Sequence, residues 1–309
     1  MMHLTYDPGL VDEAVLLSER TAPRDAVRAF RRERDRVYEI TDPDEREAAF
    51  EALHLRWFAG LQLPNLVESL VAERANIGEW LEEGRVLRAV TRQEEGADLV
   101  DQVMSGEGDR RPILVLRLRP VTLFEPEALR ALVRHELMHI ADMLDPAFGY
   151  QRALPASDDG PSRDNVQRDR YRVLWDVTID GRLARAGGDS RHPTREVRWQ
   201  EFAATFSMLG DDCRRAFDEW FDNPHPTHAA LAAFAMVPAG SEQTGDSGRC
   251  PLCRFPVAVL DPRPERLSAA TIAAIRGQHP SWEIDQGLCP QCLDLYEGRY
   301  GEMSHASCR

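Results

Sequence analysis

The sequence predicts an α+β protein that is mostly helical, with one small antiparallel sheet and a small cysteine-rich module at its C-terminal end. Three observations predict this class. Apolar residues recur at helical spacing over much of the chain. The segment Arg111–Arg119 alternates apolar and basic residues, as a strand does. Two Cys-x-x-Cys pairs follow a polar stretch near the C-terminus.

These patterns divide the chain into three expected regions. A helical region covers residues 1–84, a core with strands and helices covers 85–237, and the cysteine module covers 238–309. Residues 238–249, PAGSEQTGDSGR, have the composition of a flexible linker. With 309 residues, of which 43% are hydrophobic, the chain is long enough for one large domain or two smaller ones.

Three helices are expected before the first strand: Pro23–Ile40, Pro43–Leu61 and Leu66–Leu81. The second has a clear start at Asp42-Pro43, because proline suits the first helical position and acidic residues suit the positive end of the helix dipole. A further helix is expected after Glu125, where Pro126 again suits the first position.

Three short strands are expected to form the antiparallel sheet: Val86–Thr91, Ala97–Val103 and Arg111–Arg119. In the last of them, Leu114, Leu116 and Leu118 share one face. Residues 151–170 are polar and rich in turn formers, which predicts a long loop. Helical spacing returns over Tyr171–Arg185 and Arg195–Leu209.

The net charge of −14 argues against broad nucleic-acid binding, which needs a surface of lysine and arginine, although a local basic patch stays open. No stretch approaches the roughly 20 apolar residues that a membrane span requires. The N-terminal segment has no basic start and no uninterrupted apolar run, so we expect no secretory signal and a cytoplasmic location. A reducing compartment favours metal binding over disulfides for the paired cysteines.

The motif HELMH lies within an apolar-periodic helix. His135 and His139 are four residues apart, so a helix places both imidazoles on one face, where they can share a zinc ion. Glu136 is offset from that face and is placed to act as general base. Zinc lowers the pKa of a bound water molecule to about 7, which supplies the nucleophile at neutral pH.

A catalytic zinc ion usually has three protein ligands, so one more is expected. Asp176 and Asp180 lie on an apolar stripe of the helix YRVLWDVTIDGRLAR, and buried carboxylates there need a metal, a cation or hydrogen-bond donors. We rank Asp180 first, with Glu201, Asp176 and Asp145 as open alternatives. A different role is expected for Asp142, which can accept the other N–H of a ligand imidazole.

The strand RPILVLRLR and the helix carrying HELMH resemble the core of the zincin metallopeptidases over roughly residues 85–210. The resemblance implies zinc-dependent hydrolysis of peptide bonds, with a strand at the edge of the cleft that pairs with the substrate; we expect Leu114–Leu118 to do so. The spacing of Asp176 and Asp180 is similar to the gluzincin pattern E-x-x-x-D, in which one acid binds zinc and the other braces a ligand histidine. Asp142 stands where the metzincin pattern has glycine, which favours the gluzincin-like arrangement.

The cysteine pairs Cys250/Cys253 and Cys289/Cys292 are separated by 35 residues, which include an expected helix over Leu267–Gly277. Four thiolates in two such pairs make a closed tetrahedral site for a structural zinc ion. The module resembles zinc ribbons, which bind proteins or nucleic acids.

The expected protein is therefore a metallopeptidase with two zinc ions, one catalytic and one structural, that acts on a peptide or protein substrate. One alternative is a DNA-associated protease resembling the SprT-like family, which also joins an HExxH domain to a zinc ribbon. That family takes a third histidine, and the next histidine after His139 is His192. Another alternative is a metal-stabilised interaction protein without catalysis. The sequence assigns neither a particular substrate nor an oligomeric state.

Overall fold

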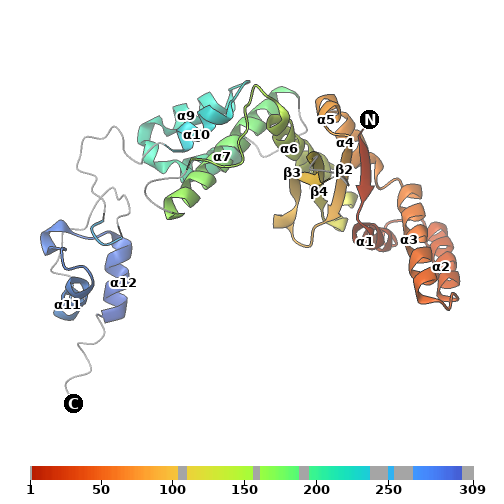
Figure 1. The fold of residues 1–309 in the computed structure, drawn as a ribbon, viewed down its shortest axis with the longest axis horizontal. Coiled ribbons are helices and arrows are strands. Elements are labelled where there is room, and N and C mark those ends of the chain that lie inside the picture. The colour runs from red at the N-terminus through yellow and green to blue at the C-terminus, as the bar shows by residue number, and fades with distance from the viewer. Residues whose placement is uncertain are drawn as a thin grey trace, which may run out of the picture. The chain divides into compact units, whose positions relative to one another are not determined.

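The computed structural model describes residues 2–103, 110–155, 161–187, 195–236, 250–253 and 267–300. The chain forms two compact units, one of residues 1–207 and 212–236 and the other of residues 208–211 and 237–309 (Figure 1). The α+β class is confirmed.

The strands and helices of the first unit are, in chain order, β1 (His3–Tyr6), α1 (Pro8–Ser18), α2 (Arg24–Tyr38), α3 (Pro43–Gly60), α4 (Asn65–Ala72), α5 (Ala75–Trp80), β2 (Glu83–Arg88), β3 (Gly96–Val103), β4 (Arg110–Leu118), α6 (Pro126–Leu144), α7 (Pro161–Arg185), α8 (Arg195–Thr205), α9 (Cys213–Phe221) and α10 (His228–Ala235).

The sheet is mixed, which corrects the expectation of an antiparallel one. Its strand order is β1-β2-β4-β3; β1, β2 and β4 run parallel, and only β3 is antiparallel, to β4. Parallel neighbours need a long crossover. The helices α1–α5 supply it between β1 and β2, so the N-terminal strand joins a sheet whose other strands come much later.

The boundary expected at residue 84 falls inside the first unit, because β1 pairs with β2 across it. A single apolar core joins the N-terminal helices to the sheet and to α6, with members such as Leu10, Phe58, Leu116 and Val133. The predicted starts of α3 and α6 are confirmed, and the side chain of Asp42 caps α3 by accepting from two backbone amides. The expected helix over Leu66–Leu81 is divided into α4 and α5.

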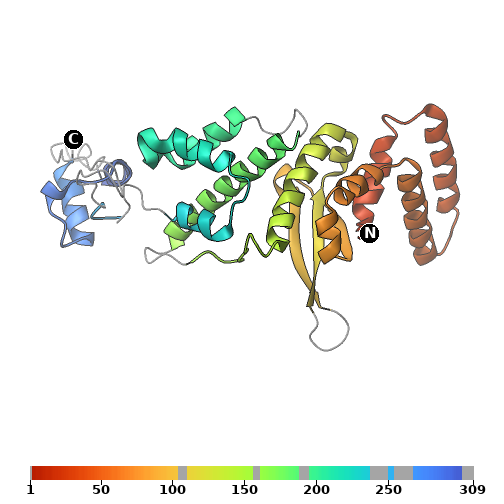
Figure 2. The same ribbon diagram turned by 90° about the horizontal axis from the view of Figure 1, so that it is seen from above.

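Strand β4 lies between β2 and β3, and its residues from Ile113 to Leu116 are buried on both faces. The expectation that Leu114–Leu118 lines a cleft edge is therefore corrected. The alternation in the sequence identifies a strand but not its neighbours. Strand β3 is one of the two edge strands of the sheet and packs against α6 (Figure 2).

Helix α7 begins at Pro161, so much of the loop expected over residues 151–170 is helical; residues 156–160 of that stretch lie outside the described residues. It packs against α8, α9 and α10 around buried aromatic side chains that include Phe202, Phe206 and Phe217. A Cβ atom at Gly181 would lie 1.8 Å from the carbonyl oxygen of Phe221, so the close approach of α7 and α9 requires glycine there.

The second unit contains α11 (Ala269–Gln278), which confirms the helix expected over Leu267–Gly277 to within two residues, and α12 (Pro290–Tyr300), which was not expected. Its core combines Ile275, Trp282 and Leu288 with buried cysteines. The linker expected over residues 238–249 lies outside the described residues. Among the described helices of both units, none has the length and apolar character needed to cross a membrane.

Candidate functional site

Helices α6 and α7 bring three metal-ligating atoms together. The Nε2 atoms of His135 and His139 lie 3.2 Å apart, and Oδ1 of Asp176 lies 3.0 Å from His139 Nε2 and 3.4 Å from His135 Nε2. Metal bonds of about 2.0–2.1 Å at tetrahedral angles place donor atoms about 3.3 Å apart. The three atoms therefore match three corners of a tetrahedral site and could hold a metal ion.

Asp180, the predicted third ligand, is not part of this group of three; Asp176, one of the open alternatives, is. Its Oδ1 accepts from Nδ1 of His135 at 2.8 Å, and its Oδ2 accepts from Nε of Arg198. The side chain is 1% exposed. A hydrogen on Nδ1 leaves the lone pair on Nε2, so this contact with Asp180 favours the form of His135 that can bind a metal ion through Nε2.

The charges around the cluster favour a bound cation. Burial lowers the pKa of His135, but hydrogen bonds and charge from Asp176 and Asp180 outweigh it and raise that pKa to about 9. Burial raises the pKa of the two carboxyls, but the histidines, and Arg198 beside Asp180, hold both below their usual values. Two ionised carboxylates therefore stabilise positive charge between these helices, from a proton or from a metal ion.

Glu136 is brought to the same pocket as the two histidines and Asp176. Its Oε2 accepts from the backbone N–H of Ala97, on the edge strand β3, at 2.8 Å. A Cβ atom at Gly96 would lie 3.3 Å from the same oxygen, so the missing side chain gives the carboxylate room. Glu136, the general base expected from HELMH, thus lies between the group of His135, His139 and Asp176 and the edge strand β3.

The remaining acidic candidates lie outside the cluster. Glu201 forms an ion pair of 2.7 Å with Arg198, the cation that also contacts Asp180. Asp145 ends α6 and accepts from the backbone N–H of Ala147 at 2.8 Å. Neither joins the three donor atoms.

Asp142 does not orient a ligand imidazole, in contrast to our expectation. It accepts two hydrogen bonds from Arg182, at 2.7 and 2.6 Å, and one from Trp175 Nε1 at 2.7 Å. The ring of Trp175 in turn packs edge-on against His139, with centroids 4.4 Å apart. Asp142 therefore acts on the site through packing rather than through a hydrogen bond to a ligand.

The pocket that contains the cluster has a volume of about 720 Å³ and is also lined by residues that sequence reasoning did not single out, among them Gln167, Arg172 and His228. His228, from α10, is 4% exposed, and its Nδ1 lies 2.8 Å from the hydroxyl of Tyr171. Burial lowers the pKa of His228 and raises that of Tyr171. Helical spacing could have placed Tyr171 beside Trp175, but no local signal connects it to His228, 57 residues away.

A second pocket of about 530 Å³ shares Met143, Tyr150 and Arg152 with the first. It reaches along β3 to Asp98 and Leu99. Because the two pockets share these residues, they are neighbours beside β3, and the two together are called the cleft.

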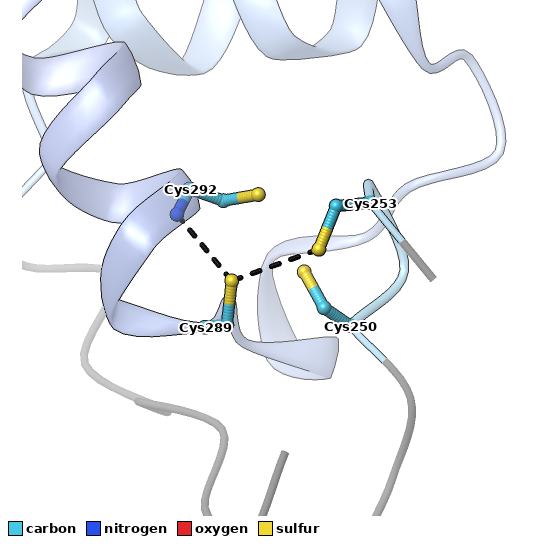
Figure 3. Close-up of side chains that lie close together, drawn as sticks. All are labelled: Cys250, Cys253, Cys289 and Cys292. Carbon is cyan, nitrogen blue, oxygen red and sulfur yellow. Dashed lines mark hydrogen bonds between the residues drawn. The ribbon is translucent and has the colours of Figure 1, made fainter. Parts of the chain in front are cut away.

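The four paired cysteines of the second unit also come together, as Figure 3 shows. Their sulfur atoms lie within 4.8 Å of one another, and those of Cys253 and Cys289 are 3.8 Å apart. Tetrahedral metal–sulfur bonds of about 2.3 Å give a separation of about 3.8 Å. Burial raises the pKa of Cys250, but hydrogen bonds from neighbouring groups outweigh it and lower the pKa to about 7, which favours a thiolate. The cluster could hold a metal ion.

No family model, no curated protein and no solved structure matches this chain. The interpretation of both centres therefore rests on their own geometry and chemistry.

Proposed function

We propose that the chain is a zinc-dependent peptidase whose catalytic ion is held by His135, His139 and Asp176. The observation that carries the proposal is the set of three donor atoms 3.0–3.4 Å apart, beside Glu136, in a pocket of about 720 Å³. Two imidazoles and a carboxylate suit zinc and leave a fourth position open for a reactant. A second zinc ion on the four cysteines holds the C-terminal module together.

The residues of the site have distinct tasks in this mechanism. When bound, a zinc ion supplies Lewis acidity, which polarises a carbonyl and makes water a stronger nucleophile. Glu136 takes the proton from the attacking water and delivers it to the departing amine nitrogen. Asp180 accepts from Nδ1 of His135 and so leaves the Nε2 lone pair available to a metal ion. Arg198 balances the buried charge of Asp180.

A peptide substrate is favoured by the position of β3 at the edge of the sheet. An extended peptide can add to an exposed strand through backbone hydrogen bonds, with its side chains in the flanking pockets. Glu136 contacts the first residues of that strand, and the cleft follows the strand away from the cluster. A peptide on β3 would therefore pass the proposed base.

The DNA-associated alternative has less support. A third histidine is expected in that family, whereas Asp176 completes the group found among the described residues. His192 lies outside the described residues.

The test compares wild type with Glu136→Gln, both loaded with zinc, on a mixed peptide library with product detection by mass spectrometry. Because Glu136 moves the proton, we expect a loss of at least about 10³-fold in kcat with two metal ions per chain retained. Glu127→Gln, on the same helix but outside the pocket, should cleave like wild type.

Two results would contradict the proposal. If Glu136→Gln cleaves as fast as wild type, the assignment of the base is wrong. If the wild type holds both ions and cleaves no peptide, the chain is not a peptidase, and the non-catalytic interpretation takes its place.

A further inference from the structure

One side of α7 lines the pocket along several turns. Residues at spacings of three and four lead to the proposed ligand: Gln167, Arg168, Tyr171, Arg172, Trp175 and Asp176. On a helix this spacing keeps side chains on neighbouring turns of one side. The helix that supplies the ligand therefore also forms a wall of the cleft.

Two arginines on this wall have no acidic partner among the residues that the structure describes. Arg172 is exposed and makes no hydrogen bond or ion pair within the part of the chain that the structure describes. The hydrogen bonds of Arg168 within the described residues are to its own helix, at the carbonyl of Asp164 and the side chain of Asn165. By contrast, Arg182 on the same helix binds Asp142 through both guanidinium NH groups. The chain has a net charge of −14, so two cations without a described acidic partner in one pocket are unusual for it and favour an anionic ligand there.

A second observation also points to a ligand. Gln167 lines the pocket and is 4% exposed, and its Oε1 is buried without a hydrogen-bond partner among the described residues. A buried acceptor without a partner is destabilising. An N–H group of a bound peptide would remove that cost.

We propose that the substrate presents a carboxylate to Arg172 and Arg168, an inference that rests on the proposed peptidase function. At about 1.5 Å per residue along the helix, the two arginines lie about 6 and 12 Å from Asp176. An extended peptide advances about 3.3 Å per residue, so the carboxylate belongs about two to four residues from the scissile bond. Asp164, one turn further along the pocket wall, limits the cationic stretch to these two turns.

Guanidinium groups bind carboxylates through paired hydrogen bonds, which is the recognition that this wall offers. The carboxylate can come from an aspartate or glutamate side chain or from the C-terminus of the peptide. Peptides with a free or an amidated C-terminus, each with glutamate, glutamine or lysine at single positions on both sides of the scissile bond, distinguish these sources.

The experiment measures binding of these peptides to zinc-loaded Glu136→Gln protein by fluorescence anisotropy, and their cleavage by wild type as kcat/KM. We expect the carboxylate peptide to bind about tenfold more tightly than its neutral counterpart, which corresponds to about 1.4 kcal/mol. In the Arg172→Glu background the order should reverse, with lysine preferred. Arg32→Glu makes the same charge change on α2, outside the pocket, and should keep the wild-type order.

The outcomes separate this inference from the proposed function. Equal binding and cleavage of acidic, neutral and basic peptides would overturn the inference and leave the peptidase intact. A uniform loss of binding for all peptides in Arg172→Glu would also overturn it, because a merely structural role predicts that result. Acid-selective binding that reverses in Arg172→Glu, without any cleavage by wild type, would support the inference and contradict the peptidase.

Discussion

The two candidate metal centres differ in how completely the protein surrounds the ion. The cysteine cluster offers four sulfur donors, three of them on buried residues, and neither of the two pockets described here includes a cysteine. The group of His135, His139 and Asp176 offers three donors and opens into a pocket. Four ligands complete a tetrahedral site, whereas three leave a corner for a reactant. This difference supports our proposal that the cysteine centre stabilises its module and that the other centre is catalytic.

The centres also differ in what holds them in place. In the second unit, Cys250, Cys289 and Cys292 are themselves members of the small core. In the first unit, helix packing around a large core positions the donors, and Asp180 and Trp175 brace the two imidazoles. Loss of the metal should therefore unfold the module but leave the first unit folded.

The largest effect is expected for Cys289→Ser. Metal binding in small cysteine modules supplies about 10–16 kcal/mol of folding free energy, so the variant should lose one metal ion per chain and the fold of α11 and α12. Metal analysis and limited proteolysis measure both. Cys213→Ser changes a buried thiol outside the cluster and should keep two ions. A Cys289→Ser protein that retains both ions would remove the contrast between the centres.

The next effect is expected for Asp176→Ala, which removes a ligand while the helices remain packed. The ion of the first unit should be lost, and the second ion should stay. Metal content and near-ultraviolet circular dichroism test this, with Asp145→Ala as a control that keeps both ions. If Asp180→Ala loses the ion and Asp176→Ala keeps it, Asp180 is the ligand after all.

A smaller loss is expected for Gly181→Ala, which forces α7 away from α9. Overpacking of this kind costs about 3 kcal/mol, seen as a lower free energy of unfolding of the first unit in urea. The metal content of the cysteine module should not change. Gly60→Ala, where no atom lies within 4 Å of the added Cβ, is the control and should stay within about 1 kcal/mol. If Gly181→Ala and Gly60→Ala are equally stable, the close contact between α7 and α9 does not contribute to the stability of the first unit.

The smallest effect is expected for Asp180→Asn, which keeps the shape of the side chain that braces His135. Loss of such a partner weakens metal affinity about 10- to 100-fold. Competition with a fluorescent chelator at neutral pH measures it. Glu201→Gln changes another acidic partner of Arg198 that does not contact His135, and should leave the affinity near that of wild type. Equal affinities in the two variants would mean that the contact between Asp180 and His135 contributes little.

The candidate site shows how far sequence reasoning reaches. The spacing of HELMH places two donors and a carboxylate correctly, because a helix fixes the positions of neighbours. Of the pair Asp176 and Asp180, the sequence favoured Asp180 as the metal ligand, whereas it is Asp176 that lies with the two imidazole Nε2 atoms and Asp180 that contacts Nδ1 of His135. Both lie on the same stripe of α7, and their roles depend on how α7 meets α6 and on Arg198 from α8. How these helices pack is tertiary structure, which the local sequence pattern does not contain.

The fold has the same limit. The alternation of β4 predicts a strand, but not its place inside a mixed sheet. β1 has only four residues and was not predicted, because it is stabilised by pairing with residues about 80 positions later, Glu83–Val86. A local sequence pattern does not show which distant strand a short segment such as β1 will pair with.

The position of β3 at the edge of the sheet also affects how copies of the chain behave toward one another. A strand left open for one peptide is open to any extended chain, including a second copy of this protein, and such edges promote aggregation. Here Asp98 and Asp101 are exposed along the edge, and Arg152 contacts the carbonyl of Leu99. Bringing this strand against its own copy would juxtapose like charges, at a net charge of −14 on each chain. The acidic side chains along β3 would therefore oppose the pairing of this edge with a second copy.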